Sequence, residues 1–474
     1  MKFEQMEEQI VVGLDIGTTK VCAIIASMNE DRTINILGVG KAPSEGLNRG
    51  VVVNIDKTVN AIRSAIEKAE LASGIKVKAV NVGIAGDHIS SMRSRGAVTN
   101  INQDSEITAK DVERLLIDCQ QVALPAGQQI IHVIPQEYVV DGQDGITDPI
   151  GMCGIRLEAN VHIITGMVSA IKNMYRCVEK AGYKVQDMIL EPLASSYAVL
   201  EKDEKEAGVV LVDIGGGTTD IAIFKGNTIR HTAVCAIAGQ KVTDDIKDGL
   251  SILEDQAHRL KHQHGHAWAD LIEEEEVIPV PGIAGRPPKE VRKTILANII
   301  QPRLEEILEI VGIEIKRSGL GNQLSAGVVL TGGGSMINGM VPLAAEYLGL
   351  DTKLGTPRGL TGGLIEEVNS PIHSTGVGLV MHAFESVQNA YLAQMNPMSA
   401  AQPHGAGVTP ATEPVRQNDR AGESTETHEN SSSPKNDTTE QEDGENPLQT
   451  GGKQTAESLM QKITKQMKIW FREF

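Results

Sequence analysis

Aromatic residues and long apolar runs are scarce in this chain. Only 3% of its 474 residues are Phe, Trp or Tyr. No stretch approaches the run of about 18 apolar residues that a membrane-spanning helix needs. The first ten residues are too acidic and polar for a secretory signal peptide. These absences predict a cytoplasmic protein with no spanning helix.

Positive charge is also in short supply. The chain has 44 Lys and Arg against 62 Asp and Glu, and its formal net charge of −18 argues against a general nucleic-acid binder. No GxxxxGK(S/T) pattern occurs, which excludes the commoner phosphate-binding loop. The five cysteines lie far apart without a CxxC pair, so we expect buried free thiols in a reducing compartment. They are Cys22, Cys119, Cys153, Cys177 and Cys235.

Two segments far apart in the chain repeat one pattern. Residues 11–25 read VVGLDIGTTKVCAII, and residues 209–224 read VVLVDIGGGTTDIAIF. Each has an apolar run, an Asp, a Gly/Thr-rich turn and a second apolar run, which predicts two strands joined by a tight turn. Because glycine lacks a Cβ, the backbone N–H groups of such a turn can close on an anion, and threonine hydroxyls add donors. We therefore expect two similar domains that grip one phosphorylated ligand between them.

The order of apolar segments indicates an α/β protein with insertions. Residues 10–395 alternate apolar strands with amphipathic helices, and their length predicts more than one domain. A 3.6-residue period predicts a helix over 58–72. Residues 87–165 differ, because a helix at 108–122 lies between strand-like stretches, and they predict an inserted α+β subdomain. A second, helix-rich insertion follows at about 243–316.

The composition changes abruptly after Asn396. Residues 396–452 consist mainly of Gly, Pro, Ser, Thr, Asn, Gln and Glu, with three basic against ten acidic residues. Such a segment cannot bury enough apolar surface to fold. As a flexible coil it would span on the order of 40–45 Å. We interpret it as a disordered linker that acts as a tether.

Residues 453–474, beyond the linker, predict an amphipathic helix. Apolar residues recur at three- and four-residue steps, as on one face of a helix: Met460, Ile463, Met467, Trp470, Phe471 and Phe474. Basic residues flank that face: Lys462, Lys465, Lys468 and Arg472. This pattern suits a membrane surface, where anionic lipids add roughly 1 kcal/mol per basic residue. The alternative is a helix that docks on the protein's own core or on a partner.

Four further segments fit a nucleotide cleft between duplicated domains, and one of them is a predicted helix around residues 257–265. Glu191 precedes Pro192 at the start of a predicted helix. Its alternative role is that of a carboxylate favoured there by the helix dipole. Residues 332–335 follow an apolar strand and form a turn on which a flat base can lie, or simply a tight turn. Residues 375–383 begin a helix with small side chains.

Together, and in this order, these segments resemble the actin/Hsp70/sugar-kinase superfamily, and most closely its FtsA family of actin-like bacterial cell-division proteins. The resemblance covers nearly all of residues 10–395. Its motifs are DIGTTK, HVIPQEYVVDGQDGITDPIGMCG, EPLASSYA, DIGGGTTD, GRPPK and LTGGGSMI. It implies an α/β protein with duplicated actin-like (ribonuclease H-like) ATPase domains, an inserted α+β subdomain, a disordered linker and a C-terminal amphipathic helix.

The resemblance also implies how the chain is divided. The parts would be subdomain 1A at 10–86 and 166–206, the inserted FtsA-type subdomain 1C at 87–165, subdomain 2A at 207–242 and 319–374, subdomain 2B at 243–318, a helix returning to 1A at 375–395, the linker at 396–452 and the amphipathic helix at 453–474.

Cofactors implied by the resemblance are ATP and Mg²⁺. The first phosphate turn would comprise Asp15, Gly17, Thr18, Thr19 and Lys20, and the second Asp213, Gly215, Gly216, Gly217, Thr218 and Thr219. Mg²⁺ would lie near Asp15 and Asp213, mostly through waters, because it keeps its hydration shell. The adenosine would be held by Gly332, Gly333, Gly334 and Ser335. Any hydrolysis would depend on Glu191, the position of the water-activating residue in Hsp70-like members.

One departure from the family pattern concerns the helix that faces the ribose. The family usually carries Ala-Glu-x-x-Lys there, and this chain has Ala257 to Lys261 with His258 in the acidic position. Lys261 fits the pattern, whereas His258 puts ribose recognition in doubt. A metal site is an alternative for this stretch, since His258 and His262 have the i,i+4 spacing that metals use and His264 and His266 follow.

Partners and location are implied in the same way. Arg303 and Glu306 fall on the helix that would receive the C-terminal peptide of FtsZ, or on a solvated helix face. The inserted subdomain would contact later division proteins and neighbouring copies. The terminal helix would attach the protein to the cytoplasmic face of the inner membrane, at the division septum.

The function that we expect is that of an ATP-binding, polymerising adaptor that tethers FtsZ filaments to the membrane and helps assemble the septal ring, with at most weak ATPase activity. Two alternatives come from the same superfamily. A small-molecule kinase would need a catalytic Asp base at a substrate pocket, for which the sequence offers no convincing candidate. An actin-like adaptor of pilus assembly would share the core and lack the terminal helix.

Overall fold

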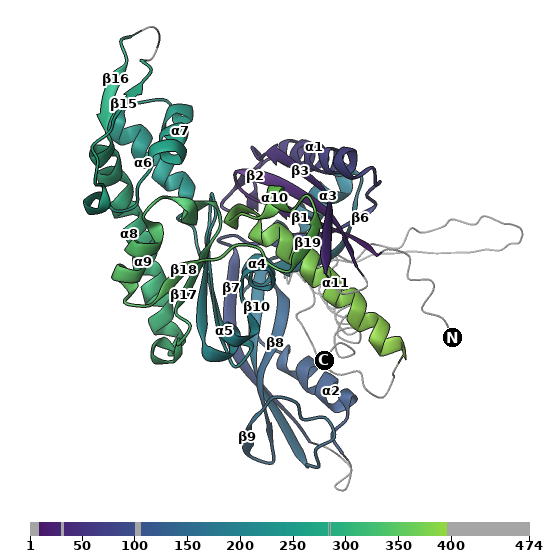
Figure 1. The fold of residues 1–474 in the computed structure, drawn as a ribbon. Coiled ribbons are helices and arrows are strands. Elements are labelled where there is room, and N and C mark those ends of the chain that lie inside the picture. The colour runs from purple at the N-terminus through teal and green to yellow at the C-terminus, as the bar shows by residue number, and fades with distance from the viewer. Residues whose placement is uncertain (1–8, 30–32, 100–105, 283, 285, 396–474) are drawn as a thin grey trace, which may run out of the picture.

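The computed structural model describes the core of the chain (Figure 1), namely residues 9–29, 33–99, 106–282, 284 and 286–395. The predicted linker, 396–452, and the predicted amphipathic helix, 453–474, lie outside the described residues. Three large sheets with their helices form two domains and an inserted subdomain.

The first domain is built on a six-stranded sheet of order β11-β6-β1-β2-β3-β19. The strands are β1 (Ile10–Ile16), β2 (Lys20–Met28), β3 (Ile34–Pro43), β6 (Ala79–Ile84), β11 (Lys184–Leu190) and β19 (Leu360–Gly363). β1 and β2 form an antiparallel hairpin, while β6 runs parallel to β1, as a helical crossover requires. β19 pairs with β3 here, although its residues fall within 319–374, the range expected for the second domain.

Helix α1 (Ile55–Ser73) supplies that crossover and covers β2 and β3. The side chain of Asn54 caps its start by accepting a 3.0 Å hydrogen bond from the N–H of Lys57, and Gly74 ends it with a φ of 72°. Ile62 and Ile66 are fully buried, which confirms the predicted period. Nearby elements are β4 (Leu47–Asn48), β5 (Val51–Val52), α3 (Val168–Ala181) and α4 (Glu191–Val199).

The insertion is a four-stranded antiparallel sheet of order β7-β10-β8-β9 with one helix against it. Its elements are β7 (Ile89–Thr99), α2 (Ala109–Cys119), β8 (Gln128–Val140), β9 (Gln143–Ile146) and β10 (Arg156–Met167). Leu115 and Leu116 of α2 are fully buried in a core of their own under this sheet. The insertion is therefore the α+β subdomain that the sequence predicts.

The second domain repeats the plan of the first on a five-stranded sheet of order β14-β13-β12-β17-β18. The strands are β12 (Val209–Ile214), β13 (Thr219–Lys225), β14 (Thr228–Cys235), β17 (Val328–Thr331) and β18 (Thr352–Leu354). β12 and β13 form an antiparallel hairpin, and β17 runs parallel to β12. The same pairings in both domains confirm the predicted duplication.

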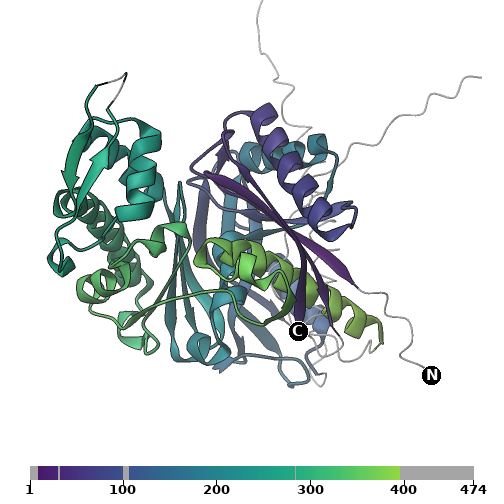
Figure 2. The same cartoon turned by 45° about the horizontal axis from the view of Figure 1, so that its top comes forward.

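Helices surround the second sheet and extend beyond it. α5 (Lys202–Ala207) leads in from the first domain, and α6 (Gly239–Leu250), α7 (Glu254–His264) and α8 (Lys293–Ser318) follow β14. A small hairpin joins α7 to α8, through β15 (Val277–Val280) and β16 (Lys289–Arg292). Figure 2 shows this helical region on one side of the molecule and α1 on the other.

The chain then returns to the first domain. α9 (Met340–Leu348) packs on α8, and short elements follow: α10 (Ile365–Val368) and the 3₁₀ helix η5 (Pro371–His373). The last described helix, α11 (Ser374–Met395), packs on α4 and β1. In Figure 2 it starts near the middle of the molecule and extends away from the helical region of the second domain.

The insertion also touches the second domain directly, along edge strand β14. Gln136 Nε2 donates to the carbonyls of Ile229 and Arg230 at 3.1 and 3.0 Å. His162 Nε2 and Thr232 Oγ1 share a 2.8 Å hydrogen bond. This contact covers a sheet edge that would otherwise offer unpaired backbone groups.

All five cysteines are free, and three of them are buried as expected. Burial raises the pKa of Cys22 to about 11 and that of Cys119 to about 12. The expectation is wrong for Cys153, which is exposed, and for Cys235, which is half-buried.

Candidate functional site

The two predicted turns have the same hydrogen-bonded geometry. The N–H of Gly17 donates to the carbonyl of Lys20 at 3.0 Å, and the N–H of Gly215 donates to the carbonyl of Thr218 at 2.9 Å. Strand pairing begins directly outside each turn. Two separate parts of the chain thus fold into equivalent tight hairpins because their Gly/Thr-rich sequences allow it.

The tips of the two turns lie against each other. A Cβ placed on Gly216 would overlap the side chain of Thr19, and a Cβ on Gly217 would overlap that of Thr18. Glycine is thus required in the second turn because the first turn occupies the space that a side chain would need. The duplicated domains therefore meet at these two turns, residues 17–20 and 215–218, as the sequence predicts. We call them the phosphate-type turns.

A cavity of about 510 Å³ opens at this junction. Its volume lies in the range of small-molecule sites, about 300–1,000 Å³. It is lined by most of the residues expected to bind a cofactor or to act in hydrolysis: Asp15, Gly17, Thr18, Thr19, Lys20, Glu191, Asp213, Gly215, Gly216, Gly217, Thr218, Lys261, Gly332, Gly333 and Gly334. One cavity therefore brings together residues from both domains.

Two of the expected cofactor residues lie behind the cavity wall. Thr219 is fully buried, and its Oγ1 donates to the carbonyl of Ile237 at 2.8 Å. Ser335 lies in the 3₁₀ helix η4 (Gly333–Met336), and its Oγ donates to the carbonyl of Gly332 at 2.7 Å. Both side chains shape the backbone that faces the cavity.

Other lining residues were not predicted for the cavity. They include Asp220, Gly239, Gln240 and Ile372. Asp220 could have been found from the strand register, since it pairs directly with Asp213 across the hairpin. The sequence carries no comparable signal for Gln240, which reaches the site through the start of α6.

Asp213 and Asp15 are both buried at the ends of their strands. Asp213 Oδ2 accepts hydrogen bonds from Ser195 Oγ at 2.7 Å and from Thr375 Oγ1 at 3.3 Å. Burial raises the pKa of Asp213, and the charge of Asp15 raises it further, against those two hydrogen bonds. Lys20 Nζ lies 3.4 Å from Asp15 and donates to the carbonyl of Ile372 at 2.5 Å.

Glu191 and Asp220 add two more buried carboxyl groups. Burial raises the pKa of Glu191 well above its ordinary value, and Asp15, Asp220 and Asp213 add to the effect. Burial and then Asp213 raise the pKa of Asp220 to about 8. Oδ1 of Asp220 has no hydrogen-bond partner among the described residues. The cavity therefore gathers acidic groups that favour either a proton or a cation.

Direct metal ligation is a separate question. Within the part of the chain that the structure describes, no group of three or more His, Cys, Asp or Glu side chains is arranged to hold a metal ion. Buried carboxylates such as Asp15 and Asp213 nevertheless suit a hydrated Mg²⁺, which is usually held by one or two carboxylates and several waters.

Lys261 and two histidines form the wall on α7. Lys261 Nζ donates to the carbonyl of Gly239 at 2.7 Å and to Thr243 Oγ1 at 2.8 Å, and burial lowers its pKa to about 8. The imidazoles of His258 and His262 both line the cavity, with ring centroids 4.4 Å apart. Burial lowers the pKa of each.

The other two histidines of this stretch do not join that pair. His264 Nδ1 lies 3.1 Å from Glu276, and His266 Nδ1 accepts the N–H of Trp268 at 3.2 Å. The four histidines that the sequence places together are thus divided between different partners, and the metal alternative gains no support from their arrangement.

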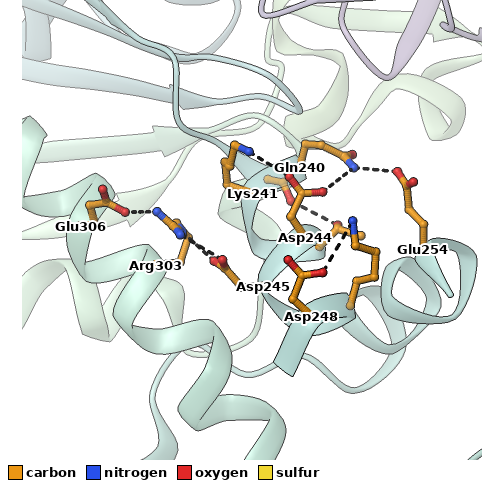
Figure 3. Close-up of polar contacts among 11 residues, drawn as sticks. Gln240, Lys241, Asp244, Asp245, Asp248, Glu254, Arg303 and Glu306 are labelled. Carbon is orange, nitrogen blue, oxygen red and sulfur yellow. Dashed lines mark hydrogen bonds and ion pairs between the residues drawn. The ribbon is translucent and has the colours of Figure 1, made fainter. Parts of the chain in front are cut away.

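The expected partner-binding residues lie outside the cavity, on α8. Arg303 donates to both oxygens of Asp245 on α6, from Nε at 2.6 Å and from Nη2 at 2.9 Å (Figure 3). Its Nη1 binds Glu306 one turn along α8. Arg303 and Glu306 thus belong to a network that the sequence does not reveal, because Asp245 is 58 positions away.

The expected membrane-binding residues, Met460 to Phe474, lie outside the described residues. None of the helices that the structure describes is long and apolar enough to cross a membrane.

Two α/β domains of one plan, hairpin turns that meet at a shared cavity and a helix returning to the first domain define an actin-like protein. A solved type IV pilus biogenesis complex, PilM–PilN, has a similar fold with a TM-score of 0.58 at 15% identity, covering 78% of this chain and 98% of that chain. The chain belongs to the FtsA family of cell-division proteins. The family profile "Cell division protein FtsA" matches residues 210–378, and the profile "SHS2 domain inserted in FTSA" matches residues 86–165.

Curated relatives support the same assignment over most of the chain. The cell division protein FtsA of Pseudomonas aeruginosa is 46% identical over 377 residues, which are 80% of this chain and 90% of the relative. That of Escherichia coli is 38% identical over 390 residues, 81% of this chain and 92% of the relative. That of Bacillus subtilis is 40% identical over 375 residues, 79% of this chain and 83% of the relative. The chain is therefore an actin-like cell-division protein.

Proposed function

We propose that this protein binds ATP and tethers FtsZ filaments to the cytoplasmic face of the bacterial inner membrane, where it helps assemble the septal ring. The observation that carries the proposal is the convergence of two equivalent hairpin turns, from two domains, on one cavity. The proposal includes self-association into polymers and contacts with later division proteins, in keeping with membership of the FtsA family.

The turns offer hydrogen-bond donors that suit phosphate groups. Among the described residues, the backbone N–H groups of Gly216 and Gly217 donate no turn or loop hydrogen bond to a backbone carbonyl. These groups and the Thr18 hydroxyl suit an anion, and the cations of Lys20 and Lys261 face the same cavity. Mg²⁺ would be held through waters by Asp15 and Asp213 and would neutralise charge on the phosphates. Gly332 has a φ of 81°, and its backbone lies close to Asp213, on the side of the cavity where adenosine is expected.

Any hydrolysis of ATP would rest on Glu191. A general base works best when its pKa lies near the working pH, and burial together with the aspartates raises the pKa of Glu191 in that direction. A Glu191→Gln variant should keep its affinity for ATP within a few-fold and lose about 10²–10⁴-fold of any hydrolysis rate. Release of phosphate, measured beside binding of a fluorescent ATP analogue, separates the two effects.

The attachment of FtsZ and of the membrane involves other parts of the chain. Arg303 and Glu306 on α8 would contact the C-terminal peptide of FtsZ. The apolar face and basic flanks predicted over 453–474 would bind anionic lipids of the inner membrane. The linker predicted over 396–452 would allow the core to reach filaments away from the lipid surface.

The decisive experiment is a binding assay with a synthetic FtsZ C-terminal peptide and the full chain. We expect saturable binding that is weakened by Glu306→Lys. A control variant, Glu309→Lys, changes another acidic residue of α8. Failure of the wild-type chain to bind the peptide would overturn the partner assignment, since neither a small-molecule kinase nor a pilus adaptor should bind it.

A further inference from the structure

Helix α6 is fastened to the second phosphate-type turn at its start. The N–H of Gly239 donates to the carbonyl of Gly215 at 3.1 Å, and the N–H of Gln240 donates to the carbonyl of Gly216 at 2.8 Å. Both acceptors belong to the turn that faces the cavity. A shift of this turn therefore moves the first residues of α6 with it.

Side chains strengthen the attachment of α6 to the cavity wall. Gln240 Nε2 donates to Glu254 at 2.8 Å, at the start of α7, and lies 3.4 Å from Asp244 (Figure 3). Lys261 of α7 binds the carbonyl of Gly239. The first half of α6 is thus positioned by groups that line the cavity.

The second half of α6 holds the expected partner-binding helix. Asp245 accepts both parallel hydrogen bonds of the Arg303 fork, an arrangement that fixes geometry as well as adding energy. The hydrogen bonds that Arg303 donates to Asp245 raise the pKa of Arg303, and burial partly offsets this effect. Because Nη1 binds Glu306, each side-chain nitrogen of Arg303 is already bound to a carboxylate.

Arg303 is therefore not a free cation on the surface. Its side chain is 26% exposed and that of Glu306 is 42% exposed, so Glu306 is the more accessible of the two. The position of Glu306 depends on Arg303, and the position of Arg303 depends on Asp245. The three side chains carry a net charge of −1, which would complement a basic group of a partner.

We propose that Asp245 is a positioning residue that couples the nucleotide cavity to the partner surface on α8. The coupling runs from the turn at Gly215 and Gly216 through α6 to Asp245, and from there to Arg303 and Glu306. It rests on the proposed function, because it needs both a nucleotide and a peptide partner. ATP bound at the turn would hold α6, and with it Glu306, in the arrangement that the peptide prefers.

Neighbouring carboxylates on α6 do not share this position. Asp244 lies 3.0 Å from Lys241 on its own helix. Asp248 lies 3.8 Å from Lys247, and its side chain is 77% exposed. Asp248→Asn is thus a matched control, since it removes one charge from the same helix without touching α8.

The test measures the affinity of the full chain for a labelled FtsZ C-terminal peptide by fluorescence anisotropy, with and without saturating ATP and Mg²⁺. Couplings between sites are typically about 5–150-fold. For the wild type and for Asp248→Asn we expect ATP to raise peptide affinity at least about fivefold. For Asp245→Asn we expect less than about a twofold effect, with ATP affinity in the absence of peptide unchanged.

A second variant and the reciprocal titration make the test independent of one substitution. Arg303→Lys keeps the charge but loses the two-pronged contact, so it should also lose the coupling. By linkage, the peptide must raise the affinity for ATP by the same factor in the wild type. Circular dichroism of each variant reports whether it is folded.

The outcomes distinguish the proposed binding of the peptide from the proposed coupling through Asp245. If the wild-type chain binds ATP but no peptide, the partner function is wrong and the coupling falls with it. If the wild type binds the peptide equally well with and without ATP, the coupling alone is overturned. Full coupling in both folded variants, Asp245→Asn and Arg303→Lys, would overturn the role of Asp245.

Discussion

Gly216 packs against Thr19, so the turn of one domain occupies the space in which the turn of the other would carry a side chain. The two residues belong to hairpins that lie far apart in the sequence. Because the two turns touch, each turn limits the space available to the other. The shape of the phosphate-type site therefore depends on both domains at once.

Replacing Gly216 by valine should abolish tight binding of ATP. The added atoms overlap Thr19, and strain of about 1–3 kcal/mol is typical of such overpacking. If all of that strain opposes binding, it corresponds to a loss of affinity of roughly 5- to 160-fold. Titration with a fluorescent ATP analogue measures the loss.

Gly312→Ala is the control for that substitution. A Cβ at Gly312 has only Leu348 at an ordinary 3.6 Å, and the residue lies inside α8. This variant should bind ATP as the wild type does and gain up to about 1 kcal/mol of stability. Normal ATP affinity in Gly216→Val would contradict the placement of the turn at the ligand.

Asp220→Asn should stabilise the ligand-free protein at high pH. The pKa of Asp220 is raised to about 8 in the folded chain, above the ordinary value of about 3.9 for the unfolded chain. Between these values the folded carboxyl binds a proton that the unfolded one has lost, so stability falls as pH rises from about 4 to 8. Asparagine does not ionise, and the advantage of the variant should grow by up to about 1.4 kcal/mol per pH unit across that window.

Urea unfolding at pH 5, 6, 7 and 8 measures this difference. Asp203→Asn on α5 is the control, because it makes the same substitution at an exposed carboxyl group. A constant stability difference for Asp220→Asn would show that the buried carboxyl does not titrate in this range.

ATP affinity should increase as the pH falls below about 6.5, in part through His258 and His262. Burial lowers the pKa of both imidazoles, Lys261 acts in the same direction, and Asp255 and Glu254 oppose it at His258. A bound triphosphate favours the charged form of each ring, so binding takes up protons. The effect is at most about tenfold per pH unit for each imidazole.

The double variant His258→Gln, His262→Gln should bind ATP with a shallower pH dependence. The carboxyls of Glu191 and Asp220 also take up protons and would account for the slope that remains. Binding of the ATP analogue between pH 5.5 and 7.5 provides the comparison. Identical slopes in wild type and double variant would show that the histidines do not face the phosphates.

Removal of residues 457–474 should release the protein from anionic liposomes and leave ATP affinity unchanged. The predicted apolar face and the basic residues would both be lost. Replacing only Lys462, Lys465, Lys468 and Arg472 by Gln should weaken binding by roughly 1 kcal/mol per residue. Co-sedimentation with vesicles measures both effects, and unchanged sedimentation of the truncated chain would rule out the membrane role.

Much of the fold could be predicted because the signals are local. DIGTTK and DIGGGTTD specify strand, turn and strand within a few residues, and α1 follows from its apolar period. The repetition of this pattern predicted what periodicity alone does not, namely that the two hairpins converge, and the resemblance of the whole set of motifs agreed with it. Long helices and hairpin turns were thus accessible from the sequence.

The contacts that set the chemistry could not be predicted in the same way. Ser195 and Thr375 reach Asp213 from α4 and α11, and no spacing in the sequence reveals that they meet. Arg303 was interpreted as a surface residue, whereas Asp245 holds it from another helix. Such pairings depend on how helices pack, which hydrophobic patterns determine only loosely.

The contact between β14 and the insertion affects how force passes through the molecule. Two chain crossings and the contact between the two turns already link the domains, and the hydrogen bonds of Gln136 and His162 add a further junction between the insertion and the second domain. A force applied to the insertion by a neighbouring molecule would therefore reach the second domain through this junction as well as through the first domain.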